Sequence, residues 1–135
     1  MHSSPAVTGT PARLLRLEGA AVAALSVAIY ATSDAPWWLF AACLLLPDVA
    51  MIGYLGGPGP GARLYNAAHT YLGPVLLAAI GLWSQIDLAL ALAYIWGTHI
   101  GIDRTAGYGL KYPQGFRATH LAQSDAPPVK ALPRA

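Results

Sequence analysis

The chain has 135 residues, of which 56% are hydrophobic and 10% are charged, and its formal net charge is +2. A soluble domain of this size usually has about 25% charged residues, so this composition excludes an ordinary water-exposed surface. The small net charge and the lack of a clustered basic face exclude nucleic acid as a partner. The composition therefore predicts an integral membrane protein whose main partner is the lipid bilayer.

Four apolar runs of about 17 to 20 residues follow one another, each long enough to cross most or all of a bilayer core of about 30 Å. The predicted spans cover about residues 14–31, 36–55, 64–83 and 86–103. A turn at Gly56–Gly61, written Gly-Gly-Pro-Gly-Pro-Gly, separates the second run from the third, and no helix is expected to continue through it. Residues 13–122 form the predicted membrane domain, between disordered tails at residues 1–12 and 123–135. Phe116–Gln123 is predicted to form a short helix at the inner interface.

The basic residues give the predicted orientation. All eight fall in the two terminal segments, at their junctions with the spans, or beside the Gly/Pro turn: Arg13, Arg16, Arg63, Arg104, Lys111, Arg117, Lys130 and Arg134. Because Lys and Arg mark the cytoplasmic side, we expect an all-α, four-helix transmembrane bundle with both termini in the cytoplasm. A competing interpretation treats residues 1–33 as a cleaved signal peptide, which would leave three spans.

Four predicted spans each contribute an ionisable residue at a similar depth on the cytoplasmic side: Glu18, Asp48, His69 and His99. Such residues are costly inside a membrane, so each one needs a partner or a function. His99 and Asp103 are four residues apart and share a helix face, as do Asn66 and His69, which are three residues apart.

Two carboxylates and two imidazoles from different helices are a common set of ligands for zinc, iron or manganese. We expect Asp48, His69, His99 and Asp103 to bind such a divalent metal ion. Glu18 is then a further ligand or a general base, and Arg104 binds an anionic group such as a lipid phosphate. Asn66 and His120 are predicted supporting residues, His120 from the interfacial helix.

These residues also allow two other interpretations. The polar side chains could form a hydrogen-bonded network that only holds the helices together, or they could form a path for protons or ions. The first predicts an accessory membrane subunit and the second a conduit, whereas a metal site could activate water as a membrane-embedded metal-dependent hydrolase. The sequence leaves these alternatives open.

Two sequence features concern helix packing. Gly97 and Gly101 form a small-xxx-small pattern that allows a neighbouring helix to approach closely, either within the bundle or in a homo-oligomer. Packing within the bundle is the expected use. Pro47 is predicted to kink the second span just before Asp48 and to free a backbone carbonyl, and Pro74 could act similarly in the third.

Several motifs resemble those of a family of small bacterial four-span membrane proteins, which is defined only as a domain of unknown function. They are Leu46-Pro47-Asp48, Tyr65-Asn66-x-x-His69-x-Tyr71, His99-x-Gly101-x-Asp103-Arg104, Gly107-Tyr108-Gly109-Leu110-Lys111-Tyr112-Pro113 and Phe116-x-x-Thr119-His120-Leu121. The resemblance covers about residues 13 to 121 and implies a multi-pass protein of the bacterial inner membrane, but it implies no activity. A looser likeness to membrane-bound metal-dependent hydrolases, with different motif order and spacing, slightly favours the hydrolase interpretation, in which Arg104 would bind a lipid or phosphate-bearing substrate.

Overall fold

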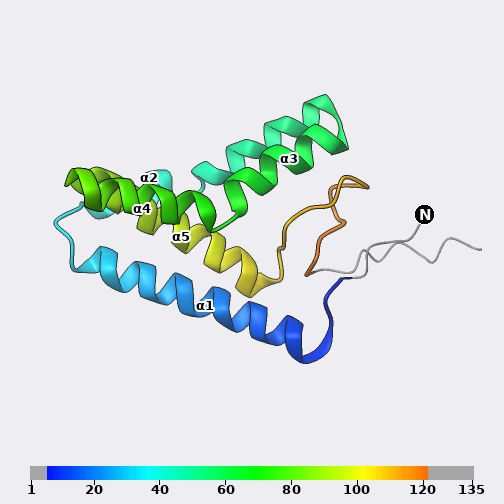
Figure 1. The fold of residues 1–135 in the computed structure, drawn as a ribbon, viewed down its shortest axis with the longest axis horizontal. Helices are drawn as coiled ribbons and strands as arrows, with labels where there is room; N and C mark the ends of the chain where they lie inside the picture. The colour runs from blue at the N-terminus through cyan, green and yellow to red at the C-terminus, as the bar shows by residue number, and fades with distance from the viewer. Residues whose placement is uncertain (1–5, 122–135) are drawn as a thin grey trace, which may run out of the picture.

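The computed structural model describes residues 6–121 (Figure 1). In this part of the chain, all regular secondary structure is helical apart from one isolated β-bridge. The elements are α1 (Gly9–Ala31), α2 (Trp37–Cys43), the 3-10 helix η1 (Leu46–Gly56), α3 (Pro58–His69), α4 (Leu72–Ser84) and α5 (Asp87–Ala106). The prediction of an all-α protein is confirmed. The predicted tail at residues 123–135 lies outside the described residues, and the first helix begins at Gly9, several residues before the predicted start of the membrane domain.

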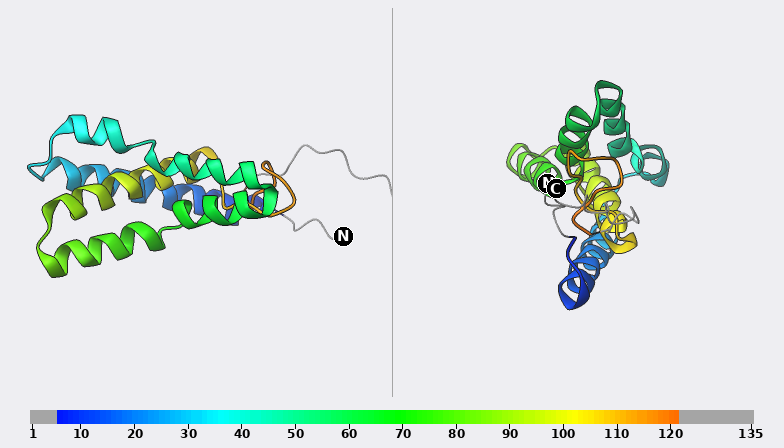
Figure 2. Two further views of the ribbon diagram at one scale, coloured as in Figure 1. Left: turned by 90° about the horizontal axis from the view of Figure 1, so that it is seen from above. Right: turned by 90° about the vertical axis from the view of Figure 1, so that its right-hand side faces the viewer.

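The helices run along the long axis of the molecule in alternating directions (Figure 2). Helices α2 and η1 together make one pass along this axis, and α3 and α4 together make another. The α1–α2 and α4–α5 connections lie at one end of the molecule, which is called the loop end below. The start of α1, the η1–α3 turn and the end of α5 lie at the other end (Figure 2). Helix α5 is central, since it packs against α1, α2 and α4.

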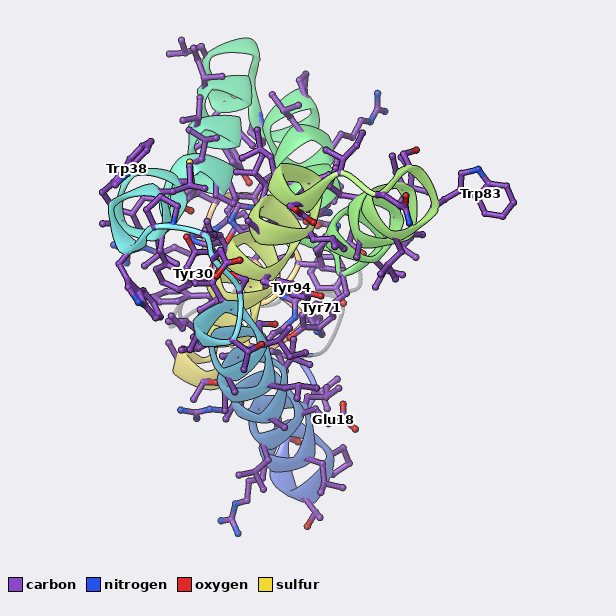
Figure 3. All side chains as sticks on the ribbon, turned by 90° about the vertical axis from the view of Figure 1, so that its left-hand side faces the viewer. Glu18, Tyr30, Trp38, Tyr71, Trp83 and Tyr94 are labelled. Carbon is purple, nitrogen blue, oxygen red and sulfur yellow. The ribbon has the colours of Figure 1, made fainter. Side chains whose placement is uncertain are left out.

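By length and composition, some of the helices are candidates for crossing a membrane. Gly9–Ala31 and Trp37–Gly56 are long and apolar enough to cross a bilayer, and the bent pair α3–α4 makes a third candidate if it is a single span. At the loop end, Trp38 and Trp83 project away from the bundle on opposite sides (Figure 3). Exposed indole rings at this position are typical of a membrane–water interface.

The second apolar run is interrupted where Pro47 was expected to act. Helix α2 ends at Cys43 and η1 begins at Leu46. Because Pro47 has no N–H, backbone carbonyls one turn earlier lose their helical donor. Asp48 therefore lies in the first turn of a new helical segment, after the break.

No helix continues through Gly56–Gly61, as predicted, because η1 ends at Gly56 and Gly57 is not helical. The turn is nevertheless shorter than its Gly/Pro sequence indicates, since α3 already begins at Pro58. The first N–H groups of a helix have no acceptor within the helix, so Pro58 and Pro60 lose no hydrogen bond in its first turn. Gly57 makes the reversal from η1 with a φ of 105°, a conformation that favours glycine.

The third apolar run is also two helices, which meet at an angle of 41°. Helix α3 ends at His69, Thr70 is extended, and α4 begins at Leu72. Pro74 lies in the first turn of α4, where its missing N–H costs nothing. The break leaves the carbonyl groups at the end of α3 available to other donors.

The predicted interfacial helix at Phe116–Gln123 is not formed in its described part, residues 116–121. Instead the chain from Gly107 to Leu121 folds back on itself, with an isolated antiparallel bridge between Lys111 and Thr119. Tyr112 N donates to Ala118 O at 2.8 Å. These hydrogen bonds between the two halves of the folded-back segment satisfy backbone groups that a helix would have satisfied locally. We call residues 107–121 the C-terminal segment.

The Gly97–Gly101 pattern packs within the bundle, against α1. A Cβ atom added at Gly101 would lie 2.5 Å from Gly19 O and 2.7 Å from Ala23 N, both backbone atoms of α1. A Cβ atom at Gly97 would lie 3.1 Å from Ser26 Oγ. The absence of side chains at these glycines therefore sets how closely α1 approaches α5.

Candidate metal centre

Four side chains from three helical elements converge at the breaks described above. Asp48 comes from the first turn of η1, His69 from the last residue of α3, and His99 and Asp103 from adjacent turns of α5. Each offers one ligand atom, and these four atoms all lie within 4.8 Å of one another. The two imidazoles are buried and the two carboxylates are partly buried. We call these residues the His/Asp cluster.

Five of the six distances between the ligand atoms of the His/Asp cluster are short and nearly equal, and the sixth, between the two carboxylate oxygens, is at most 4.8 Å. The Nε2 atoms of His69 and His99 are 3.1 Å apart. Asp48 Oδ1 lies 3.2 Å from His69 Nε2 and 3.3 Å from His99 Nε2. Asp103 Oδ2 lies 3.5 Å from His69 Nε2 and 3.3 Å from His99 Nε2. Ligand atoms about 2.1 Å from a tetrahedral ion lie about 3.4 Å from one another, so this spacing fits a tetrahedral metal site.

The contacts on the outer side of the rings support this arrangement. His69 Nδ1 lies 2.9 Å from Tyr65 O, a carbonyl that can only accept, so Nδ1 carries the ring proton. In the neutral ring, Nε2 then presents a lone pair to the centre of the cluster. The backbone of Leu44, in the break before Pro47, lies close enough to the His99 ring to interact with it. Backbone carbonyls often orient metal-binding histidines in this way.

Lone pairs therefore face one another at the centre of the His/Asp cluster. His69 Nε2 has no proton of its own to share with the two carboxylate oxygens or with His99 Nε2. With the His99 proton also on Nδ1, the cluster presents four electron-rich atoms, five of whose six separations are 3.1–3.5 Å, and these atoms repel one another unless a cation lies between them. A divalent metal ion meets this requirement, and so do added protons.

Two aromatic side chains support the His69 side of the cluster. The Tyr65 ring stacks on the His69 ring, with the centroids 3.7 Å apart and the planes 7° from parallel. Trp96 Nε1 donates to Ala68 O at 2.6 Å, which joins α5 to the end of α3. Neither residue was among the predicted site residues. The signals that could have found them are the four-residue spacing of Tyr65 and His69 and the position of Trp96 inside the fourth predicted span.

Arg104 is buried beside the His/Asp cluster and hydrogen-bonds to backbone carbonyl groups. Its guanidinium donates to His69 O at 2.9 Å and to Tyr108 O at 3.3 Å. These contacts satisfy a carbonyl left free at the α3–α4 break and join the C-terminal segment to α5. The predicted role of Arg104 was to bind an anion, and the described contacts show a structural role for at least two of its five N–H groups.

Asn66 and Lys111 form a second point of attachment for the C-terminal segment. The Asn66 amide donates to Lys111 O at 2.8 Å and accepts from Lys111 N at 2.6 Å. The Lys111 ammonium is buried, 4.6 Å from the Tyr65 ring centroid and 3.6 Å from that of Phe116, and it donates to Phe116 O. Burial lowers the pKa of Lys111, while the nearby carboxylates of Asp103 and Asp48 oppose this effect.

Of the other predicted residues, Glu18 lies outside the His/Asp cluster. It is exposed on α1, and its side chain projects from that helix (Figure 3). His120 lies in the C-terminal segment, where its Nδ1 accepts a hydrogen bond from Leu110 N at 2.9 Å. Asn66 and His120 therefore support the C-terminal segment, and the structure brings together only the four predicted metal ligands.

The His120 contact predicts a pH-dependent attachment of the C-terminal segment. Burial, and then the nearby charge of Arg104, lower the pKa of His120 below its ordinary value of about 6.5. A released segment would bind a proton more readily than the attached one, so attachment should be intact above about pH 6.5 and weaken as the pH falls below it. Protonation of Nδ1 would also remove the acceptor for Leu110 N.

Hydrogen exchange of residues 107–121 in lipid vesicles measures this effect. Exchange should accelerate between about pH 6.5 and pH 5, after correction for intrinsic rates. His120→Asn keeps a side-chain acceptor without a titratable group, so its protection should be less sensitive to pH. Equal pH dependence in both proteins would contradict a role for His120.

Together, the helices and the cluster define a class: an all-helical protein with candidate membrane-spanning helices and a His/Asp group that could hold a metal ion. A family model described as "Domain of unknown function (DUF4260)" matches residues 12–123, and the chain belongs to this family. The resemblance to a family of unknown function is thus confirmed. No curated protein and no solved structure matches the chain.

Proposed function

We propose that this protein crosses the bacterial inner membrane four times and holds a divalent metal ion, such as zinc, iron or manganese, in the His/Asp cluster. The observation that carries the proposal is the convergence of Asp48, His69, His99 and Asp103, whose ligand atoms lie within 4.8 Å of one another. The near-equal distances and the inward-facing lone pairs favour an ion over a purely structural network.

The alternating directions of the helices support four spans. Helix α5, which was not among the apolar candidates, carries Asp87, Asp103 and Arg104, and its charged residues lie at its two ends or in the cluster. Within the described residues, the basic side chains Arg13, Arg16, Arg63, Arg104, Lys111 and Arg117 belong to segments opposite the loop end. By the positive-inside rule we assign that end to the cytoplasm.

The chemistry that we propose is hydrolysis of a lipid or phosphate-bearing substrate near the cytoplasmic face. A metal ion held by these four side chains would need a further ligand position, beyond the tetrahedral set, to activate water and to polarise an oxygen of the substrate. The chain's own contribution is to fix the ligands: Tyr65 orients His69, the α2–η1 break presents Asp48, and the C-terminal segment covers Tyr65. Glu18 is exposed on α1, outside the cluster. It is the general base in this proposal only if substrate binding brings Glu18 and the His/Asp cluster together.

Metal analysis of the purified protein tests the proposal. The protein should contain about one divalent ion per chain after extraction in mild detergent without chelator, and a chelator should lower its thermal stability, because metal that binds only the folded state stabilises it. A protein that contains no stoichiometric metal, and that takes up none when zinc, iron or manganese is added, would refute the metal site.

A proton path is the second candidate, and the 3.1 Å separation of the two Nε2 atoms favours it. A proton shared between imidazoles would also relieve the repulsion in the His/Asp cluster. Liposomes with an imposed pH gradient distinguish the two functions. A conduit gives proton flux above that of empty vesicles and loses it in His99→Ala, whereas a metal centre gives no such flux.

A further inference from the structure

An apolar cavity of about 320 Å³ lies next to the His/Asp cluster. It is bounded by residues from the α2–η1 pass, from α4 and from α5. These residues are Cys43, Leu46, Pro47, Leu77, Leu92, Ile95 and Trp96. Every side chain in this lining is apolar or, for Cys43 and Trp96, largely so, and the cavity therefore suits a hydrocarbon occupant.

The cavity and the His/Asp cluster adjoin one another. Pro47 lines the cavity and is the residue before Asp48. Ile95 and Trp96 also line it and precede His99 by four and three residues, so they lie on the same face of α5, about 5.4 Å away. Trp96 is held against α3 by its bond to Ala68 O, which makes this wall rigid. A single molecule could therefore occupy both regions.

The direction from the cluster to the cavity matches that of a lipid. The lining residues of α5 lie on the Asp87 side of His99, toward the loop end and the middle of the proposed span. A lipid of the cytoplasmic leaflet likewise places its head near that surface and its chain toward the bilayer centre. An amphipathic molecule with its head at the cluster would have its chain in the cavity.

The charges next to the cluster favour an anionic head. Asp48 and Asp103 would together neutralise a divalent ion. Arg104 and Lys111 are both 7% exposed. Within residues 6–121, no ion pair joins either of them to a carboxylate. With a divalent ion bound, these two buried cations would leave the region with a positive surplus, which a phosphate group would balance.

We propose that the cavity binds one hydrocarbon chain of a lipid whose phosphate-bearing head lies at the His/Asp cluster. This inference rests on the proposed function, since the cluster with its metal ion receives the head. It narrows the substrate class from any phosphate-bearing molecule to an amphipathic lipid.

Photolabelling tests the proposal. The probe is lysophosphatidic acid with a diazirine in the middle of its single chain, added at trace level to phosphatidylcholine vesicles that contain the full-length protein. Mass spectrometry then locates the labelled residues. We expect label on residues that line the cavity, and an excess of unlabelled lysophosphatidic acid should remove this label while leaving background labelling of lipid-facing residues unchanged.

A matched pair of α4 variants provides the control. Leu77 lines the cavity, whereas its neighbour Leu76 is 64% exposed. Leu77→Trp should fill the cavity and reduce its labelling by at least about tenfold, and Leu76→Trp should leave it unchanged. If Leu77→Trp does not fold, Cys43→Leu provides a second, smaller filling of the same cavity.

Metal content measured on the same preparations separates the two proposals. Labelling spread evenly over lipid-facing residues and insensitive to Leu77→Trp, in a protein that keeps its metal, overturns the lipid-chain site and leaves the metal centre. Competable labelling of the cavity in a protein that binds no metal overturns the metal centre and supports the chain-binding cavity.

Discussion

His69→Ala should remove nearly all metal from the purified protein, and His99→Ala should do the same. Each change deletes one of four ligand atoms and leaves the two carboxylates facing a cavity. Loss of a group that merely orients a ligand typically costs 10- to 100-fold in metal affinity, so loss of a ligand should cost at least about 100-fold. Metal content by mass spectrometry and competition with a chelator of known affinity measure the change.

Glu18→Gln is the matched control for these variants. Glu18 is ionisable and was a predicted ligand, but it is exposed on α1 and lies outside the His/Asp cluster. Its replacement should leave metal content within the error of the parent protein. Metal loss in Glu18→Gln would show that the sequence-based ligand set is right and that α1 moves toward the cluster. Metal retained in both histidine variants would contradict the cluster as the binding site.

Gly101→Ala should destabilise the protein more than Gly97→Ala, the same change at the other glycine of α5. The added Cβ atom would lie 2.5 Å and 2.7 Å from backbone atoms of Gly19 and Ala23, which cannot turn aside. Helix α1 must therefore move away from α5 along their shared face. Overpacking of this kind typically costs about 1 to 3 kcal/mol, and backbone contact places this site at the upper end.

Unfolding of the protein in mixed micelles measures this loss, with Gly59→Ala as the control. Gly59 lies in α3, and an added Cβ atom meets nothing within 4 Å, so alanine should be neutral or slightly stabilising there. Gly101→Ala should also lower metal content less than His69→Ala at temperatures where it remains folded. Equal stability of the two glycine variants would show that α1 and α5 are not in close contact in the membrane.

The sequence predicted which four side chains meet because burying charged groups in an apolar chain is costly. With so few charged residues, Asp48, His69, His99 and Asp103 stood out against their apolar surroundings, and helical spacing placed His99 beside Asp103. Glu18 met the same criteria and yet is exposed. Depth along a helix can be read from sequence, but the side of the helix that faces the bundle depends on packing partners.

Local geometry at the helix breaks was less predictable. The Gly/Pro turn favoured a loop, but prolines at the start of a helix lose no hydrogen bond, so α3 begins at Pro58. Phe116–Gln123 was expected to be helical, but in the described residues Ala118 O instead accepts a hydrogen bond from Tyr112 N. Such alternatives differ little in local energy, and contacts with distant residues such as Asn66 select between them.

The sequence by itself determined that this protein is helical and apolar enough for a membrane, and that a few ionisable residues must serve a purpose there. Only the tertiary structure decided which of them meet. The breaks before Asp48 and after His69 turn these residues toward α5, Arg104 satisfies a carbonyl freed at one break, and the glycines fix the position of α1. These outcomes depend on distances between segments far apart in the chain, which local patterns of hydrophobicity and charge do not contain.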